Sequence, residues 1–181
     1  MAANAGKIDA RLAALLAPVR LLVLDVDGTL TDGSVATTHD DEVQRFNVRD
    51  GFGIVEAQKQ GLIIAWISGR GSLATERRAS DLRIAEVHLR ARDKAAALRT
   101  IQERLHIAPA ATAAMGDDLP DLALRPCVAL FAAPANAVAE VLARADLVTA
   151  ARGGEGAVRE FIELILRSQG RWQAVVDAHG G

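Results

Sequence analysis

Carboxylates, a hydroxyl and a lysine recur along this chain directly after short apolar runs. The three clearest cases are Asp25-Val26-Asp27-Gly28-Thr29 after Leu21–Leu24, Ser68-Gly69-Arg70 after Ile63–Ile67, and Gly116-Asp117-Asp118 after Ala113–Met115. Lys94 opens a helical pattern after a further apolar run. In an open parallel sheet, the carboxyl ends of the strands line one crevice where ligands bind. We therefore expect these polar side chains to meet in a single site.

Asp25 and Asp27 lie two residues apart, so both carboxylates can face one pocket if the chain coils after Asp25. Gly28 permits the tight turn that such coiling requires. Two close carboxylates repel each other unless a cation or a proton intervenes, and Asp117 offers a third. A divalent cation with oxygen ligands resolves this repulsion. Mg²⁺ suits best, because it accepts few protein oxygens and completes its shell with water and phosphate oxygens.

A phosphate group held by such a cation gives the remaining side chains distinct roles. Asp25 would attack phosphorus and form an aspartyl-phosphate, and Asp27 would protonate the leaving oxygen and later deprotonate water. Lys94 and Ser68 would bind the phosphoryl oxygens. Each motif alone also has a structural interpretation as a turn, a helix N-cap or a surface lysine. Their joint occurrence at predicted strand ends favours the catalytic interpretation.

Six apolar runs alternate with helical patterns, as in a parallel α/β sheet. The predicted strands are 20–24, 62–67, 85–89, 112–115, 127–131 and 146–148. The predicted helices lie within the first 17 residues and near 53–60, 72–81, 93–105, 119–124, 136–143 and 156–168. This pattern predicts a Rossmann-like α/β fold with helices on both faces of the sheet, in a single domain covering 1–181. Residues 170–181, which are Gly-rich at both ends, are expected to form a flexible tail.

Residues 33–48 interrupt this alternation. Two segments with β patterning flank the polar sequence His39-Asp40-Asp41, which predicts a β-hairpin inserted after the first strand. Too few residues separate the first two motifs to form a large cap domain. The apolar side chains of an isolated hairpin would have little to pack against: Val35, Val43 and Phe46. This favours cover by a neighbouring subunit, and the alternative is that the hairpin folds back on its own subunit.

The composition excludes several other classes of protein. Half of the residues are hydrophobic and 24% are charged, which is ordinary for a globular protein. A net charge of −2 without a basic block gives no basis for nucleic-acid binding. The single cysteine, Cys127, excludes an internal disulfide. The sequence shows neither a membrane span nor a secretory signal, so we predict a cytoplasmic enzyme without membrane partners.

Together the motifs resemble those of the haloacid dehalogenase superfamily of phosphohydrolases. The matching segments are Asp25–Thr31 for the first motif, Ser68 for the second, Lys94 for the third and Gly116–Asp121 for the fourth. The resemblance implies that Asp25, the Asp27 backbone carbonyl and Asp117 hold Mg²⁺. It also implies that Asp118 and Asp121 stand behind the metal ligands and support them.

A narrower resemblance is to the 3-deoxy-D-manno-octulosonate 8-phosphate phosphatases. It spans about residues 20–165 and is carried by Asp32-Gly33, Phe46–Gly53, Ile67–Arg70 and Arg152–Glu160, although Thr29 stands where these enzymes commonly have Val. Members of that family lack a cap domain and form tetramers in which the hairpin of one subunit helps to cover a neighbour's active site. The resemblance implies a homotetramer. It also supplies candidates for binding the sugar and carboxylate of the substrate: Arg49, Asp50, Gly69, Arg70 and Arg152. Each of the four charged residues among them has a structural ion pair as its alternative.

We therefore predict a Mg²⁺-dependent phosphomonoesterase that acts on 3-deoxy-D-manno-octulosonate 8-phosphate, a small phosphorylated sugar acid of lipopolysaccharide precursor synthesis. The nearest alternative substrate is a nonulosonate 9-phosphate of the sialic acid type. An alternative of another class is a non-catalytic oligomerisation module. The intact set Asp25, Asp27, Lys94 and Asp117 argues against the module.

Overall fold

Six short strands form the centre of the structure. The computed structural model describes residues 9–37 and 42–180. The strands of the central sheet are β1 (Leu21–Leu24), β4 (Ile63–Ile67), β5 (Glu86–His88), β6 (Thr112–Met115), β7 (Leu130–Ala133) and β8 (Leu147–Val148). The helices are α1 (Ala10–Leu16), α2 (Val48–Lys59), α3 (Leu73–Asp81), α4 (Lys94–Leu105), α5 (Ala139–Leu142), α6 (Ala157–Ser168) and α7 (Trp172–Ala178), with 3₁₀ helices η1 (Pro109–Ala111) and η2 (Leu119–Cys127).

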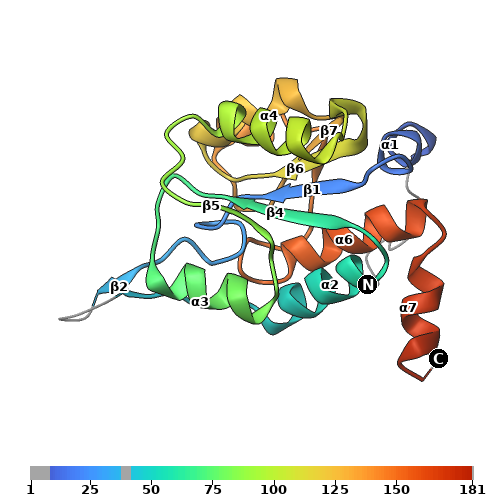
Figure 1. Cartoon of the computed structure of the whole chain (residues 1–181), viewed down its shortest axis with the longest axis horizontal. Coiled ribbons are helices and arrows are strands. Elements are labelled where there is room, and N and C mark those ends of the chain that lie inside the picture. Colours follow the sequence, from blue (N-terminus) through green and yellow to red (C-terminus); the bar gives the residue numbers. More distant parts are fainter. Residues whose placement is uncertain (1–8, 38–41, 181) are drawn as a thin grey trace.

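The sheet has the order β5-β4-β1-β6-β7-β8, and every neighbouring pair of strands is parallel. Figure 1 shows α4 on one face of the sheet and α2, α3 and α6 on the other. The predicted α/β fold with helices on both faces is therefore confirmed. Strand β1 lies between β4 and β6, so the three strands that precede the candidate motifs are neighbours.

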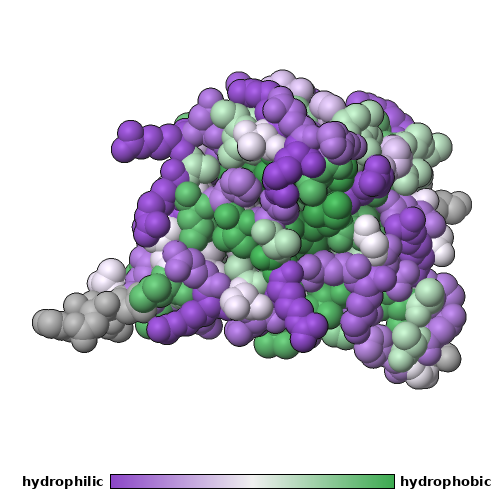
Figure 2. All heavy atoms as spheres, in the orientation of Figure 1, coloured by the Kyte–Doolittle hydropathy of each residue, from purple (hydrophilic) through white to green (hydrophobic). Residues whose placement is uncertain are grey.

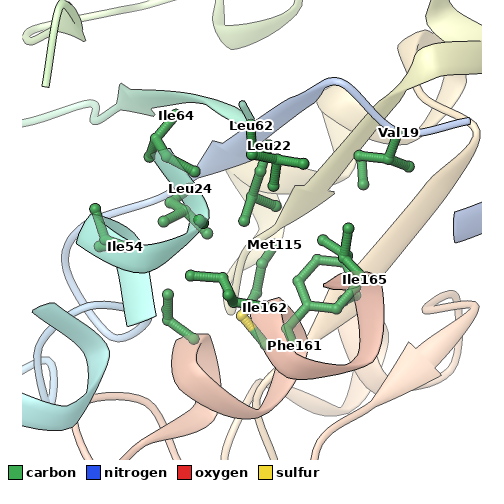
Figure 3. Close-up of a cluster of buried hydrophobic side chains, with 14 of the residues drawn as sticks. Val19, Leu22, Leu24, Ile54, Leu62, Ile64, Met115, Phe161, Ile162 and Ile165 are labelled. Atoms are coloured by element: carbon green, nitrogen blue, oxygen red, sulfur yellow. The ribbon is translucent and has the colours of Figure 1, made fainter. Parts of the chain in front are cut away.

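Each face of the sheet carries its own hydrophobic cluster, because side chains alternate along a strand. In β1, Leu22 and Leu24 belong to the cluster that includes residues of α2 and α6, whereas Leu21 and Val23 belong to the cluster that includes residues of α4. Figure 3 shows the first cluster, in which Phe161 of α6 lies beneath the sheet. All five side chains are fully buried, so β1 is fixed from both sides.

The predicted hairpin is present but shorter than the sequence suggested. Its strands, β2 (Ala36–Thr37) and β3 (Glu42–Val43), pair antiparallel, and the predicted turn at 39–41 lies outside the described residues. The expectation that its apolar residues lack partners within the subunit is wrong for Phe46. The Phe46 ring stacks on Trp66 of β4 with ring centroids 6.3 Å apart. Val43 fits the expectation, since it is 52% exposed.

Several element boundaries differ from the prediction for identifiable reasons. Helix α2 begins at Val48 rather than near residue 53, because Asn47 caps it and Gly51 and Gly53 are accommodated inside it. A Cβ at Gly53 would lie 2.9 Å from Cδ of Arg159, so this glycine allows α2 to approach α6 closely. The segment predicted as a helix over 119–124 is the 3₁₀ helix η2, which extends to residue 127 and displaces the next strand to β7.

The C-terminal segment is folded, whereas the sequence predicted a flexible tail over 170–181. Helix α7 buries Trp172 and Val175 against the hydrophobic cluster beneath the sheet. The guanidinium carbons of Arg159 and Arg167 lie 4.9 Å and 5.4 Å from the Trp172 ring centroid. The Trp172 ring, which lies between two arginines, therefore anchors this helix. The glycines at both ends of the segment had indicated a flexible tail instead.

Hydrophilic side chains cover most of the face drawn in Figure 2, and an apolar band crosses it between α4 and α3. The outer strand at this side of the sheet is β5. A hollow of about 540 Å³ next to it is lined by Ala79, Ile84, Val87 and Leu89, among others. Among the helices of the described residues, none combines the length and apolar character needed to cross a membrane.

Candidate active site

The carboxyl ends of β1, β4 and β6 bring the predicted motifs together. Asp25 follows β1, and its N–H donates to the Met115 carbonyl of β6 at 3.0 Å. Ser68 follows β4, and its N–H donates to the His88 carbonyl of β5 at 3.0 Å. Ladder hydrogen bonds therefore continue past the strand ends and hold the two motif residues at the same edge of the sheet.

Lys94 is the centre of a buried cluster of charges. Its Nζ lies 2.5 Å from Oδ1 of Asp25 and 2.5 Å from Oδ1 of Asp121. The lysine side chain is 6% exposed, as is that of Asp25. Carboxylate oxygens of Asp25, Asp117 and Asp121 lie within 4.8 Å of one another. The structure thus assembles residues that are almost a hundred positions apart in the sequence.

The cluster carries more negative than positive charge. Burial and the neighbouring Asp121 carboxylate raise the pKa of Asp25 well above its usual value, although Lys94 opposes them. Burial and Asp121 also raise the pKa of Asp117 to about 6. Burial lowers the pKa of Lys94, but the carboxylates of Asp25 and Asp121 outweigh burial and raise it. One lysine does not offset three acids, so the cluster favours an additional cation with a preference for oxygen ligands.

Asp121 and Asp118 have different surroundings. Oδ2 of Asp121 accepts hydrogen bonds from the N–H groups of Asp117 and Asp118 at 3.0 and 3.2 Å, while its Oδ1 contacts Lys94. Asp121 therefore fixes the turn that carries Asp117. Asp118 is exposed and caps η2, with its Oδ1 accepting from the Leu119 N–H at 2.7 Å.

Gly28 and Thr29 bring the first motif against Asp117. Gly28 has φ of +93°, and a Cβ at this position would lie 2.1 Å from Oδ2 of Asp117. The Thr29 hydroxyl donates to Oδ1 of Asp117 at 3.3 Å. The threonine that departs from the family pattern thus orients a carboxylate of the candidate metal site.

The Asp27 carboxylate is held by residues of the hairpin and of the loop after β4. Its Oδ1 accepts from Nε2 of Gln44 at 2.7 Å. Its Oδ2 accepts from the Ser68 hydroxyl at 3.3 Å and lies 3.7 Å from Nε of Arg70. Arg70 also pairs with Glu42 of β3, its Nη2 lying 2.7 Å from Oε2. The hairpin base therefore completes the site of its own subunit.

Gln44 and Glu42 were not among the residues singled out in the sequence. Gln44 is fixed at its other end, because its Oε1 accepts from the hydroxyls of Ser72 and Thr75, both at 2.7 Å. No sequence motif marks these two residues, because they are ordinary polar residues of an irregular hairpin. The one available signal was that Gln44 and Glu42 alternate with the apolar Val43, so both project from the same side of the strand.

The five candidate substrate-binding residues are not equivalent. Arg70 contacts Asp27, and Gly69 beside it is exposed. Arg49 is exposed at the start of α2. Arg152 is 63% exposed, with Nε 3.9 Å from Oε1 of Glu155. These four residues remain predictions as substrate contacts.

Asp50 differs from the prediction. It is 1% exposed, and its Oδ1 accepts from the Arg159 N–H at 2.7 Å, at the start of α6. Burial raises the pKa of Asp50 to about 6, although backbone N–H groups of Arg159 and Gly156 oppose the increase. The carboxylate therefore joins α2 to α6, and no substrate could reach it without displacement of α6.

The glycines after Arg152 support the catalytic turn from behind. A Cβ at Gly153 would lie 1.7 Å from the Gly28 carbonyl oxygen, and one at Gly154 would lie 2.4 Å from the Asp32 N. The Gly154 N–H donates to the Thr29 carbonyl at 3.1 Å. Of this segment only Arg152 was predicted to contact the substrate, and the glycines that follow it pack against the first motif.

Comparison with known proteins places the geometry in a family. Residues 79–162 match the haloacid dehalogenase-like hydrolases. The chain is 40% identical over 167 residues to the 3-deoxy-D-manno-octulosonate 8-phosphate phosphatase KdsC of Escherichia coli K12, covering 92% of this chain and 89% of that protein. This chain belongs to the same phosphatase family. The predicted resemblance and the predicted class of enzyme, a phosphomonoesterase, are therefore confirmed.

Solved structures of the octulosonate phosphatase family share the whole fold. The enzyme from Yersinia pestis superposes with a TM-score of 0.90 at 36% identity, covering 93% of this chain and 91% of that one. The enzyme from Moraxella catarrhalis, solved in complex with magnesium, phosphate and KDO, superposes with a TM-score of 0.89 at 34% identity, covering 92% of this chain and 97% of that one.

Proposed function

We propose that this protein is a Mg²⁺-dependent phosphatase that converts 3-deoxy-D-manno-octulosonate 8-phosphate to the free sugar acid and phosphate. The observation that carries the proposal is the buried Asp25 carboxylate, held by Lys94 among the oxygens of Asp117 and Asp121. The 40% identity to the Escherichia coli phosphatase over 92% of this chain supports the substrate.

Asp25 is the nucleophile of the proposed reaction. Lys94 fixes the orientation of its carboxylate through Oδ1. Attack on phosphorus forms a bond between an Asp25 carboxylate oxygen and phosphorus, giving an acyl phosphate, and breaks the bond between phosphorus and the sugar oxygen. Water then attacks the same phosphorus, which releases phosphate and restores the carboxylate. Lys94 stays beside the phosphoryl oxygens and offsets their charge in both steps.

Asp27 transfers the protons that both steps require. It donates a proton to the leaving sugar oxygen in the first step and accepts one from the attacking water in the second. Contacts with Gln44, Ser68 and Arg70 hold its carboxylate at the entrance, where it is 21% exposed. This placement lets it reach a substrate oxygen that the buried Asp25 could not protonate.

The residues present fit Mg²⁺. The cluster offers carboxylate oxygens, and burial together with the Asp121 carboxylate raises the pKa of both Asp25 and Asp117. We assign the Asp25 and Asp117 carboxylates and the Asp27 carbonyl as ligands, because Asp121 is already engaged by Lys94 and two backbone N–H groups. When bound, Mg²⁺ supplies positive charge for the phosphoryl oxygens and keeps the nucleophile ionised.

The proposal extends to assembly and location. We propose a homotetramer in which the hairpin also reaches a neighbouring subunit. Its strands project from the body of the domain in Figure 1, and exposed Val43 offers an apolar contact there. A cytoplasmic enzyme that supplies the sugar acid for lipopolysaccharide precursor synthesis fits this substrate. Analytical ultracentrifugation of the wild type and of Val43→Asp tests the assembly. We expect the wild type to sediment as a tetramer and Val43→Asp to dissociate, and a Val43→Asp variant that remains tetrameric would reject the hairpin contact.

The activity is tested by phosphate release from the octulosonate 8-phosphate and from a nonulosonate 9-phosphate. We expect Mg²⁺-dependent turnover with a higher kcat/KM for the octulosonate, and none after chelation of the metal. The Asp25→Asn variant should fold with a wild-type circular dichroism spectrum and lose activity. A preference for the nonulosonate would reject the substrate, and turnover by Asp25→Asn would reject the nucleophile. If the folded wild type released no phosphate from either substrate or from an aryl phosphate, a non-catalytic role would be favoured.

A further inference from the structure

Arg90 has a backbone conformation that its position does not explain. It is one of three non-glycine residues with positive φ in the described part of the chain, together with Arg83 and His106. Arg83 and His106 lie at the C-terminal ends of α3 and α4, where a left-handed residue commonly terminates a helix. Arg90, with φ of +56°, follows strand β5 instead. Side chains disfavour this conformation, and residues that keep it are frequent at functional sites.

The backbone around Arg90 is joined to the catalytic loop. The Arg90 N–H donates to the Arg70 carbonyl at 2.9 Å, and the Ala91 N–H donates to the Ser68 carbonyl at 3.0 Å. These two hydrogen bonds place the left-handed turn next to Ser68 and Arg70. Any substrate group that extends past Arg70 therefore approaches this turn.

The side chain of Arg90 lies against Gly71. A Cβ at Gly71 would be 3.2 Å from Cζ of Arg90. Arg90 lines an open hollow of about 400 Å³ between the hairpin and the start of α3, which Glu42, Ser72 and Glu76 also line. Among the described residues, no carboxylate forms an ion pair with Arg90, whereas Glu42 is paired with Arg70.

The donors and acceptors of this hollow match a polyhydroxylated acid. One guanidinium suits a carboxylate, and the carboxylates of Glu42 and Glu76 suit sugar hydroxyl groups. The hollow begins two side chains away from Asp27, because Arg70 contacts both Asp27 and Glu42. An eight-carbon acid phosphorylated at its last carbon separates its two charged ends by up to roughly 9 Å, from C–C bonds of about 1.5 Å.

We propose that Arg90 binds the carboxylate end of the substrate and so determines specificity for phosphorylated sugar acids over neutral sugar phosphates. The inference rests on the proposed phosphatase function, since it assumes that the phosphate is bound at Asp25. It assigns no chemical step to Arg90. The residue sets KM for the acid and leaves the reaction at phosphorus unchanged.

The test compares Arg90→Gly with the matched control Arg83→Gly. Both changes remove an exposed arginine from a left-handed position, and glycine retains the backbone conformation in each case. Steady-state kinetics are measured with the octulosonate 8-phosphate and with two substrates that lack a carboxylate, a pentose 5-phosphate and 4-nitrophenyl phosphate. We expect Arg90→Gly to raise KM for the octulosonate by roughly 10- to 100-fold, as for a lost hydrogen bond to a charged group. The kcat of Arg90→Gly for the octulosonate, and its kcat and KM for both control substrates, should change less than about twofold. Arg83→Gly should match the wild type on all three substrates.

The outcomes separate this inference from the proposed function. If the wild type releases no phosphate from any substrate, the proposed function fails and the inference fails with it. If the wild type is active and Arg90→Gly keeps the wild-type KM for the octulosonate, the inference alone is wrong. A contact between Arg90 and the substrate carboxylate is also rejected if Arg90→Gly impairs turnover of all three substrates equally. It is likewise rejected if Arg83→Gly raises KM for the octulosonate as much as Arg90→Gly does. Arg90→Lys, which keeps the charge, should have a KM for the octulosonate between those of the wild type and Arg90→Gly.

Discussion

Gln44 offers the sharpest test of the idea that the hairpin base is part of the catalytic machinery. Its amide nitrogen donates to Asp27 at 2.7 Å, and its amide oxygen accepts from Ser72 and Thr75. The Gln44→Ala variant removes all three contacts, and of these only the one to Asp27 reaches a proposed catalytic group. The start of α3 keeps its own cap in the variant, because Ser72 Oγ accepts from the Thr75 N–H at 3.0 Å.

The size of the effect follows from the type of contact. A hydrogen bond to a charged group contributes roughly 1.5–3 kcal/mol. Asp27 is 21% exposed, so water replaces part of the lost contact and the lower end of that range applies. A loss of about 1.5–2 kcal/mol corresponds to a roughly 12- to 30-fold lower kcat. KM should change little, because Asp27 acts on the leaving oxygen rather than on the phosphate.

The assay is steady-state turnover of the octulosonate 8-phosphate, with rapid mixing to isolate the first step. In that step the loss should be larger for the sugar phosphate than for 4-nitrophenyl phosphate, whose leaving group needs less protonation. Gln58→Ala is the matched control, because Gln58 is half-buried and donates to the Leu82 carbonyl away from the site. A Gln44→Ala variant with kcat within twofold of wild type would refute the positioning of Asp27 by the hairpin.

Three further predictions address stability and metal binding. The pKa of Asp50 rises from 3.8 to about 6 on folding, so the native state binds more protons between these pH values and loses stability as the pH increases through them. Urea unfolding at pH 4.5 and 7.5 should show that the stability of the wild type, relative to that of Asp50→Asn, falls by about 2 kcal/mol between the two. A difference between the two proteins that does not depend on pH would contradict this. Trp172→Ala should lower the free energy of unfolding by roughly 3–5 kcal/mol, whereas no change would mean that α7 does not anchor the C-terminal segment. Mg²⁺ should raise the melting temperature of the wild type and not that of Asp117→Asn, because it binds the native carboxylates and stabilises by mass action; an equal increase in both would place the metal elsewhere.

The sequence predicted those parts of the site that depend on strand ends. Asp25, Ser68 and Asp117 each follow an apolar run, and a parallel sheet brings such positions to one edge whatever the lengths of the connecting helices. Lys94 was predictable for a related reason, because it begins the helix that crosses back over the sheet. The fold class follows from the same alternation of runs and helical patterns.

Other parts depended on tertiary contacts that leave no local pattern. Asp50 lies in a segment that resembles the octulosonate phosphatase family, and only the packing of α2 on α6 shows that its carboxylate is buried. Gln44 is one polar residue among several on the hairpin until its contact with Asp27 is seen. Trp172 anchors a helix although flanking glycines suggest a flexible chain. In each case a contact distant in the sequence overrode the local signal.

The hairpin therefore connects the position of the catalytic side chain Asp27 with the contact between subunits. Its base fixes Asp27 through Gln44 and Arg70 through Glu42, while its strands project from the domain and expose Val43. A subunit that packed against Val43 would also restrain Gln44, the next residue along the chain. In the proposed tetramer, the position of the proton-transfer group would then depend on assembly. A dissociated subunit should consequently lose kcat before it loses its affinity for Mg²⁺, since the proposed metal ligands follow β1 and β6 and are not part of the hairpin.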